Sequence, residues 1–166
     1  DKTTPVFKNF HISNVYVNGA EKAIFVRGIP EMHVKDIILE NMVFQSHKGI
    51  DVQEASNITF RNIAITSEET NPVIDIVQSD KLLFDNITYP KNAELLFRVN
   101  GDRSNAISIK HTDPSKAKEK IKYELGALDN STSFLSISPS DYKWSEKLSE
   151  TAMRLWPDSF TLEGDK

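Results

Sequence analysis

Two aspartates form the residue pair with the clearest potential for chemistry. Asp51 and Asp75 lie 24 residues apart, in the matching contexts Gly49–Val52 and Val73–Ile76. Alternate side chains of a strand point to opposite faces, so the apolar neighbours of each aspartate would face inward and both carboxylates outward. On stacked strands the carboxylates would stand about 5 Å apart, a spacing that allows a shared proton or glycoside hydrolysis. The alternative is a solvated outer column, because like charges repel only weakly in water.

A second candidate is the loop from Arg27 to His33. Arg27 could hold the carboxylate of a sugar acid through two parallel hydrogen bonds, with Glu31 in the same loop. The plainer interpretation is that Arg27 ends a strand and that Gly28–Pro30 is ordinary turn sequence. We retain four candidate substrate-binding residues and assign no catalytic residue. The four candidates are Arg27, Glu31, Asp51 and Asp75.

Composition narrows the classes of protein to which this chain could belong. Its 166 residues are 39% hydrophobic and carry a formal charge of −4, which suits a folded domain. No basic stripe suggests a nucleic-acid partner, and no apolar run approaches the roughly 20 residues that span a membrane. The chain contains no cysteine, and its four histidines lack metal-binding spacing. We therefore expect neither a metal site nor a cofactor.

A repeat explains how the candidate residues could be positioned. Four segments share the pattern apolar-x-apolar-x-Asn-apolar-x-apolar, and their asparagines are separated by 27, 21 and 24 residues. Each period holds a second short alternating strand, which leaves no room for a crossover helix. In a degenerate fifth copy, His111 takes the asparagine phase. The repeated asparagines are Asn14, Asn41, Asn62 and Asn86.

This repeat predicts a right-handed parallel β-helix of about four to five coils, each stacked about 4.8 Å from the next. Like residues then form ladders, and the asparagine column marks a bend, because asparagine tolerates the left-handed conformation. A β-sandwich would also contain short strands, but it would not place one residue type at the same phase of each period. We expect strands at 120–124 and 133–138 to close the end as a hairpin cap guarded by lysines.

The order of several stretches, rather than any single motif, carries a family resemblance. The stretches are Thr4–Asn14, Val26–Met32, Asn57–Asn62 and Asp113–Gly126. Together they resemble the closing coils of bacterial polygalacturonase-like glycoside hydrolases. The resemblance implies pectic polysaccharide or oligogalacturonate as the partner of the intact enzyme, and a secreted or periplasmic location. The family's catalytic signatures, Asn-Thr-Asp, Asp-Asp, Gly-His-Gly and Arg-Ile-Lys, do not occur in this chain, so no catalytic residue is carried over.

The C-terminal stretch has the pattern of an amphipathic α-helix that Pro157 would end. The apolar side chains of its stripe are Trp144, Leu148, Ala152 and Leu155. Residues 142–160 resemble the opening helix of unsaturated rhamnogalacturonyl hydrolases, which are α/α-barrel enzymes. We therefore divide the chain into 1–139, the coils and cap of a β-helix domain, and 140–166, a linker and the first helix of a following domain.

Two functions remain open. The first is a segment of a pectin-degrading hydrolase, which in the intact enzyme cleaves galacturonosyl linkages with inversion but here lacks the catalytic motifs. The second is a non-catalytic carbohydrate-binding or spacer β-helix module, with the outer residues Arg27, Gln53 and Arg98 touching an anionic sugar. In both cases the first coil has no coil before it in this sequence, so its exposed end predicts self-association.

Overall fold

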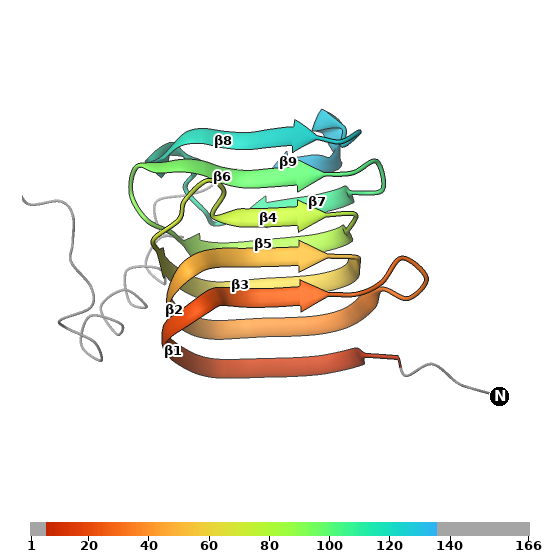
Figure 1. The fold of residues 1–166 in the computed structure, drawn as a ribbon, viewed down its shortest axis with the longest axis horizontal. Helices are drawn as coiled ribbons and strands as arrows, with labels where there is room; N and C mark the ends of the chain where they lie inside the picture. Colours follow the sequence, from red (N-terminus) through yellow and green to blue (C-terminus); the bar gives the residue numbers. More distant parts are fainter. Residues whose placement is uncertain (1–5, 136–166) are drawn as a thin grey trace, which may run out of the picture.

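The computed structural model describes residues 6–135, which form a parallel β-solenoid of about five turns (Figure 1). Two short 3-10 helices, η1 (Pro114–Lys116) and η2 (Asp129–Ser131), interrupt the strands near the C-terminal end. The predicted terminal helix and the predicted domain boundary at 139/140 lie outside the described residues. The described strands are β1 (Lys8–Arg27), β2 (Val34–Gln53), β3 (Ala55–Ser67), β4 (Ile74–Val77), β5 (Asp80–Thr88), β6 (Ala93–Asn100), β7 (Asn105–Lys110), β8 (Ala117–Glu124) and β9 (Thr132–Phe134).

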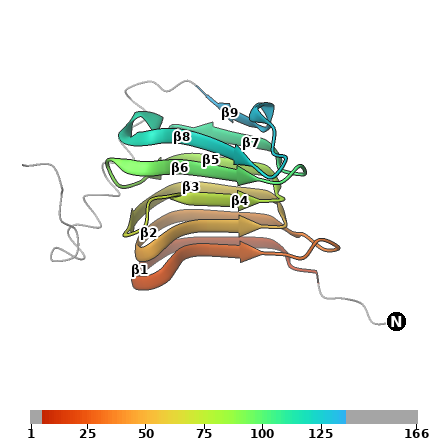
Figure 2. The same ribbon diagram turned by 45° about the horizontal axis from the view of Figure 1, so that its top comes forward.

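All strand pairings within the described residues are parallel, apart from one isolated bridge in a turn. The long strand β2 pairs with β1, β3 and β4, because it passes around a corner of the coil. Beyond it the coils divide into two stacks, β3-β5-β7-β9 and β4-β6-β8. Figure 2 shows these stacks as opposite sides of one wound ribbon. The predicted parallel β-helix is confirmed.

The asparagine column bends the chain as the repeat predicts. Asn14, Asn41, Asn62 and Asn86 have φ angles of 59°, 55°, 54° and 57°, and His111 follows at 49°. The Asn62 amide donates to Asn41 Oδ1 at 3.1 Å, and the Asn86 amide donates to Asn62 Oδ1 at 3.0 Å. A left-handed backbone costs an L-residue about 1–2 kcal/mol. Asparagine lowers this cost, and its amide adds a bond between coils.

Other left-handed columns occur that the repeat did not reveal. One consists of Asn9, Asp36, Asn57, Lys81 and Ala106, with φ between 52° and 62°. Glu54 and Gln78 share a second such corner, each with φ of 47°. Because these positions hold different residue types, they form no recognisable motif in the sequence.

Inward residues stack into an apolar interior. Phe60 and Phe84 are fully buried and lie face to face with ring centroids 4.6 Å apart. Phe84 also meets Phe97 edge to face at 5.2 Å, which joins the two stacks of strands across the core. These aromatic contacts add stability beyond that of the buried apolar area.

The predicted hairpin cap is wrong. β8 pairs in parallel with β6, and β9 pairs in parallel with β7, so the closing segment is a further partial coil. The apolar residues Ile121 and Phe134 continue interior columns, since they lie in register with Phe97 and Ile109. Burial of these side chains favours one more turn over a hairpin.

The first coil leaves its interior side open. Phe10 and Ile12 point inward by register, yet they are 45% and 46% exposed. In the Ile12 column the next residue, Leu39, is 6% exposed, and Phe60 and Phe84 beyond it are 0% exposed. Among the described strands, β1 pairs only with β2, so its other edge carries unpaired backbone groups. An open edge of this kind favours pairing with another strand.

We predict that Asn62→Ala lowers the free energy of unfolding by about 2–4 kcal/mol, because it adds left-handed strain and removes two ladder hydrogen bonds. Asn62→Gly should cost less, since glycine adopts positive φ freely. Urea denaturation measures both changes. Equal losses for the two variants would show that the backbone conformation contributes nothing.

Candidate functional site

The two aspartates lie side by side on an outer face, as predicted. Asp51 on β2 and Asp75 on β4 are direct register partners. Their chain neighbours Ile50 and Val52, and Ile74 and Ile76, are buried in the core. Only 16% and 25% of the two aspartate side chains are exposed. The spacing in the sequence therefore brought the two carboxylates together.

Each carboxylate has its own cationic partner. Lys22 Nζ lies 2.5 Å from Asp51 Oδ2, and Gln53 donates to Asp51 Oδ1 at 3.0 Å. Arg98 donates two hydrogen bonds to Asp75, from Nη2 at 2.7 Å and from Nε at 3.3 Å. Asn100 donates to the same carboxylate at 3.2 Å. The hydrogen bond with Asp75 is the main cause that raises the pKa of Arg98. This arrangement is that of two ion pairs rather than of two acids sharing one proton.

These residues belong to an outer column that crosses the coils. The column runs through Phe25, Asp51, Asp75, Arg98 and Lys122 in register. At the upper end of the column, Lys122 forms an ion pair within its own strand, because its Nζ lies 2.9 Å from Glu124 Oε1. At the lower end Lys22 Nζ lies 4.2 Å above the Phe25 ring. Opposite charges therefore meet between coils, which stabilises the stacking of neighbouring strands.

Arg27 and Glu31 occupy a different environment from the aspartates. Arg27 ends β1 in register with Gln53 and is exposed, and Glu31 is exposed in the following turn. Neither forms an ion pair with a described residue. Arg27 lies two residues after Phe25, on the same outward side of the strand, and Phe25 is 51% exposed. The structure thus groups Arg27 with Phe25 and Gln53, and it shows no contact between Glu31 and the candidates.

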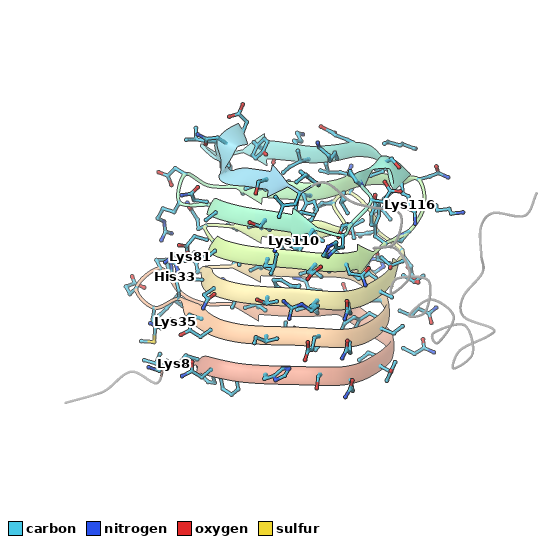
Figure 3. All side chains as sticks on the ribbon, turned by 180° about the vertical axis from the view of Figure 1, so that it is seen from behind. Lys8, His33, Lys35, Lys81, Lys110 and Lys116 are labelled. Atoms are coloured by element: carbon cyan, nitrogen blue, oxygen red, sulfur yellow. The ribbon has the colours of Figure 1, made fainter. Side chains whose placement is uncertain are left out.

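Sequence reasoning missed a cluster at one corner of the coil. Arg103 donates to Glu54 Oε1 and Oε2 at 2.8 and 3.0 Å, and His33 Nε2 lies 3.1 Å from Glu54 Oε2. Only 14% of the Glu54 side chain is exposed. His33 lies at the same margin as Lys8, Lys35 and Lys81 (Figure 3). Glu54 lies 21 residues after His33 and 49 before Arg103, about one and two periods, but the residue types change from coil to coil, so no repeated motif signals them.

A second outer line of charges runs beside the asparagine column. His11 Nε2 lies 2.6 Å from Glu40, Arg61 lies 3.2 Å from Asp85, and His111 Nδ1 lies 2.6 Å from Asp85. Arg61 also approaches Glu40 at 4.0 Å, so the line is continuous. These contacts again link successive coils.

No catalytic or metal-binding constellation stands out from these contacts. Within residues 6–135 no group of three His, Cys, Asp or Glu residues could hold a metal ion. Nor does any helix among them have the length and apolar character of a membrane span. One groove lies across β1–β3 at the left-handed corner of Asn9, Asp36 and Asn57. Its lining residues are Asn9, Phe10, His11, Asp36, Ile37, Ile38, Asn57 and Thr59.

Comparison with protein-family models, with curated proteins and with solved structures gives no match.

We predict that Asp75→Asn lowers the free energy of unfolding by about 1 kcal/mol, because Arg98 loses its charged partner. A double-mutant cycle with Arg98→Gln, followed by urea denaturation, isolates the pair. A gain in stability in Asp75→Asn would instead show that repulsion between Asp51 and Asp75 dominates.

His47 provides a pH-dependent prediction. Its hydrogen bond with Glu68, at 3.0 Å, is the main cause that raises its pKa above 6.5. A raised folded-state pKa means that the contact stabilises the fold below about pH 6.5 and is lost as pH rises through the folded pKa. NMR titration should show that Glu68→Gln moves the His47 pKa down. Glu94→Gln, remote in sequence and not in contact with His47, is the control. If the His47 pKa were the same in Glu68→Gln as in the wild type, Glu68 would not be the cause of the raised pKa.

Proposed function

We propose that this chain supplies the C-terminal coils of a polygalacturonase-like glycoside hydrolase that acts on pectic polysaccharide. Its own role in that enzyme is to continue and close the β-helix. Catalysis belongs to other coils. The pectic substrate and the secreted or periplasmic bacterial setting come from the resemblance over residues 3–139, and the β-solenoid fold agrees with that resemblance.

The main support for this proposal is a difference between the two ends of the stack in how well the interior columns are covered. At the β1 end, Phe10 and Ile12 of the interior columns are about half exposed, and the β1 edge is unpaired among the described strands. Toward the other end, Phe134 meets Phe97 at 6.1 Å, and Lys120 Nζ lies 4.4 Å above the Phe134 ring. A coil with the same apolar spacing, placed before β1, would bury the open columns and pair the open edge.

The outer charges support a scaffolding role. A glycosidase needs one carboxyl group as an acid and another as a base or nucleophile. Here Asp51 is held by Lys22 and Gln53, and Asp75 by Arg98 and Asn100. These contacts stabilise the stack, because each carboxylate is held by a cation and a side-chain amide.

The second candidate function, a non-catalytic carbohydrate-binding module, rests on Phe25 and Arg27. Both are exposed on the outward side of β1, and Gln53 lies beside Arg27 on the next coil. An exposed aromatic ring can stack on a sugar, while an unpaired guanidinium can hold a uronate carboxylate. This surface would bind the polysaccharide weakly without cleaving it.

We predict that the intact chain releases no reducing ends from polygalacturonate. Calorimetry with oligogalacturonate tests the second function, because binding that is lost in Arg27→Ala but kept in Lys48→Ala would support it. Hydrolysis that disappears in Asp51→Asn or Asp75→Asn would contradict the scaffolding role and identify these aspartates as catalytic.

The open first coil yields a separate prediction. At protein concentrations of tens of micromolar, light scattering should show a dimer or larger assembly, because a second chain can cover the exposed columns. Phe10→Asp should reduce association by placing a charge in an open column. His11→Asp, on the outward side of the same strand, is the control and should associate like the wild type. A monomeric wild type would show that the open end binds no second chain.

A further inference from the structure

One outer column differs from the charged columns described above. It consists of Tyr16, Val43, Ala64 and Thr88, which are consecutive register partners on β1, β2, β3 and β5. We call these four residues the apolar outer column. It lies directly after the asparagine corner, whereas the line of Glu40, Arg61 and Asp85 lies directly before it. Two adjoining faces of the coil therefore differ sharply in character.

Alternation places this column on the outside. Val43 stands between Met42 and Phe44, and both of these belong to the interior cluster. Ala64 stands between Ile63 and Ile65, which also belong to it. Neither Val43 nor Ala64 is a member of that cluster. Successive residues of a strand point to opposite faces, so the two side chains point away from the core.

The middle of the apolar outer column is nevertheless enclosed, whereas Tyr16 at its β1 end is 43% exposed. Val43 is 0% exposed and Ala64 is 5% exposed. The Thr88 hydroxyl is also shielded from solvent, and it has no hydrogen-bond partner among the described residues. By contrast Ile38, which points outward from β2 on the adjoining face, is 39% exposed.

Strand neighbours alone do not account for this enclosure. β1, β2, β3 and β5 pair edge to edge, so each shields the flanks of an outward side chain and not its tip. The described ribbon forms a single wound layer on this side (Figures 1 and 2). A fully enclosed valine on an outer face therefore requires a second layer over it.

We propose that residues 141–160 of this same chain cover the apolar outer column as an amphipathic helix. The segment has an apolar stripe of matching character, and a helix laid on a sheet buries such a stripe. The side chains of the stripe are Trp144, Leu148, Ala152 and Leu155.

The winding of the described coils, if continued beyond Leu135, would bring the segment to this face. Phe134 is in register with Ile109, which is in register with Phe84. In the coil of Phe84 the asparagine corner comes two residues later, at Asn86, and the apolar outer column four residues later, at Thr88. The next turn of the winding would therefore reach this face at about residue 138, just before the stripe begins. A short tether also keeps the effective concentration of the segment high, in the millimolar range.

This docking assigns the segment to the β-helix domain as an outer layer. It differs from the interpretation of residues 140–166 as the start of a following domain. It is also independent of the pectic substrate, because it rests only on the described face and the pattern of the segment.

Crosslinking tests the proposal in the full-length chain, which contains no native cysteine. Ala64→Cys combined with Leu148→Cys should give an intramolecular product with a short thiol crosslinker. The control pair is Val77→Cys with Leu148→Cys, because Val77 points outward on a different face, in register with Gln53 and Asn100. We expect roughly tenfold more intramolecular product for the Ala64 pair. Equal yields, no product, or only crosslinked dimers would overturn the proposal, the last by showing a second chain as the occupant.

Tryptophan fluorescence gives an independent readout, because the two tryptophans of the chain, Trp144 and Trp156, both lie in the segment. Val43→Asp should release the segment and shift the emission to the red while circular dichroism keeps its β-sheet signal. Ile38→Asp, on the adjoining face, should leave the emission unchanged. Unchanged emission in a folded Val43→Asp would overturn the proposal, and if that variant does not fold the crosslinking result decides.

Discussion

A coil of this solenoid can stack on the next only if the backbone bends at the same phase of each period, and at that bend an L-residue must adopt a left-handed conformation. Asn14, Asn41, Asn62 and Asn86 meet this requirement. Their amides also link the coils where Asn62 bonds to Asn41 and Asn86 bonds to Asn62. The strands between the bends then stay in register, and the interior columns and outer charge pairs follow from that register.

Register also determines which outer residues meet. Asp51 and Asp75 come together because one coil separates them, and the same spacing brings Arg98 onto Asp75. Like charges in neighbouring coils repel, and the cations beside the two aspartates, Lys22 and Arg98, offset that repulsion. The same rule gives one face its charged line and the adjoining face its apolar outer column. A solenoid can therefore present surfaces of different character without changing its core.

The repeat was sufficient to predict much of this structure from the sequence. The asparagine phase and the alternation of apolar residues predict the coils, the inward columns and the pairing of Asp51 with Asp75. The sequence did not reveal the left-handed corners at Lys81, Ala106 and Glu54, because these residue types have no characteristic preference for such a bend. The lysine-rich stretch beside two short strands, at 120–124 and 133–138, favours a hairpin in the closing segment. This segment forms a further parallel coil because Ile121 and Phe134 gain more burial by continuing the interior columns.

The polar sites can also be divided into those that the repeat predicts and those that it does not. Partners separated by one period could be anticipated, as for Asp51 and Asp75. The His33–Glu54–Arg103 cluster could not, because Arg103 reaches across the intervening corner at Gln78 to contact Glu54. Long side chains on turns bridge coils at positions where the residue type changes from one coil to the next, so no repeated motif marks them. Arg27 and Phe25 illustrate a further limit, since exposure on a strand can be predicted but the identity of a ligand cannot.

This stack of coils has an open end at β1 that another coil can cover. Amide hydrogen exchange at increasing protein concentration tests it most directly. We predict that protection of the β1 amides rises with concentration, because a second chain pairs with their open edge, while the β3 amides keep a constant, high protection. Protection of β1 that equals that of β3 at every concentration would contradict the claim.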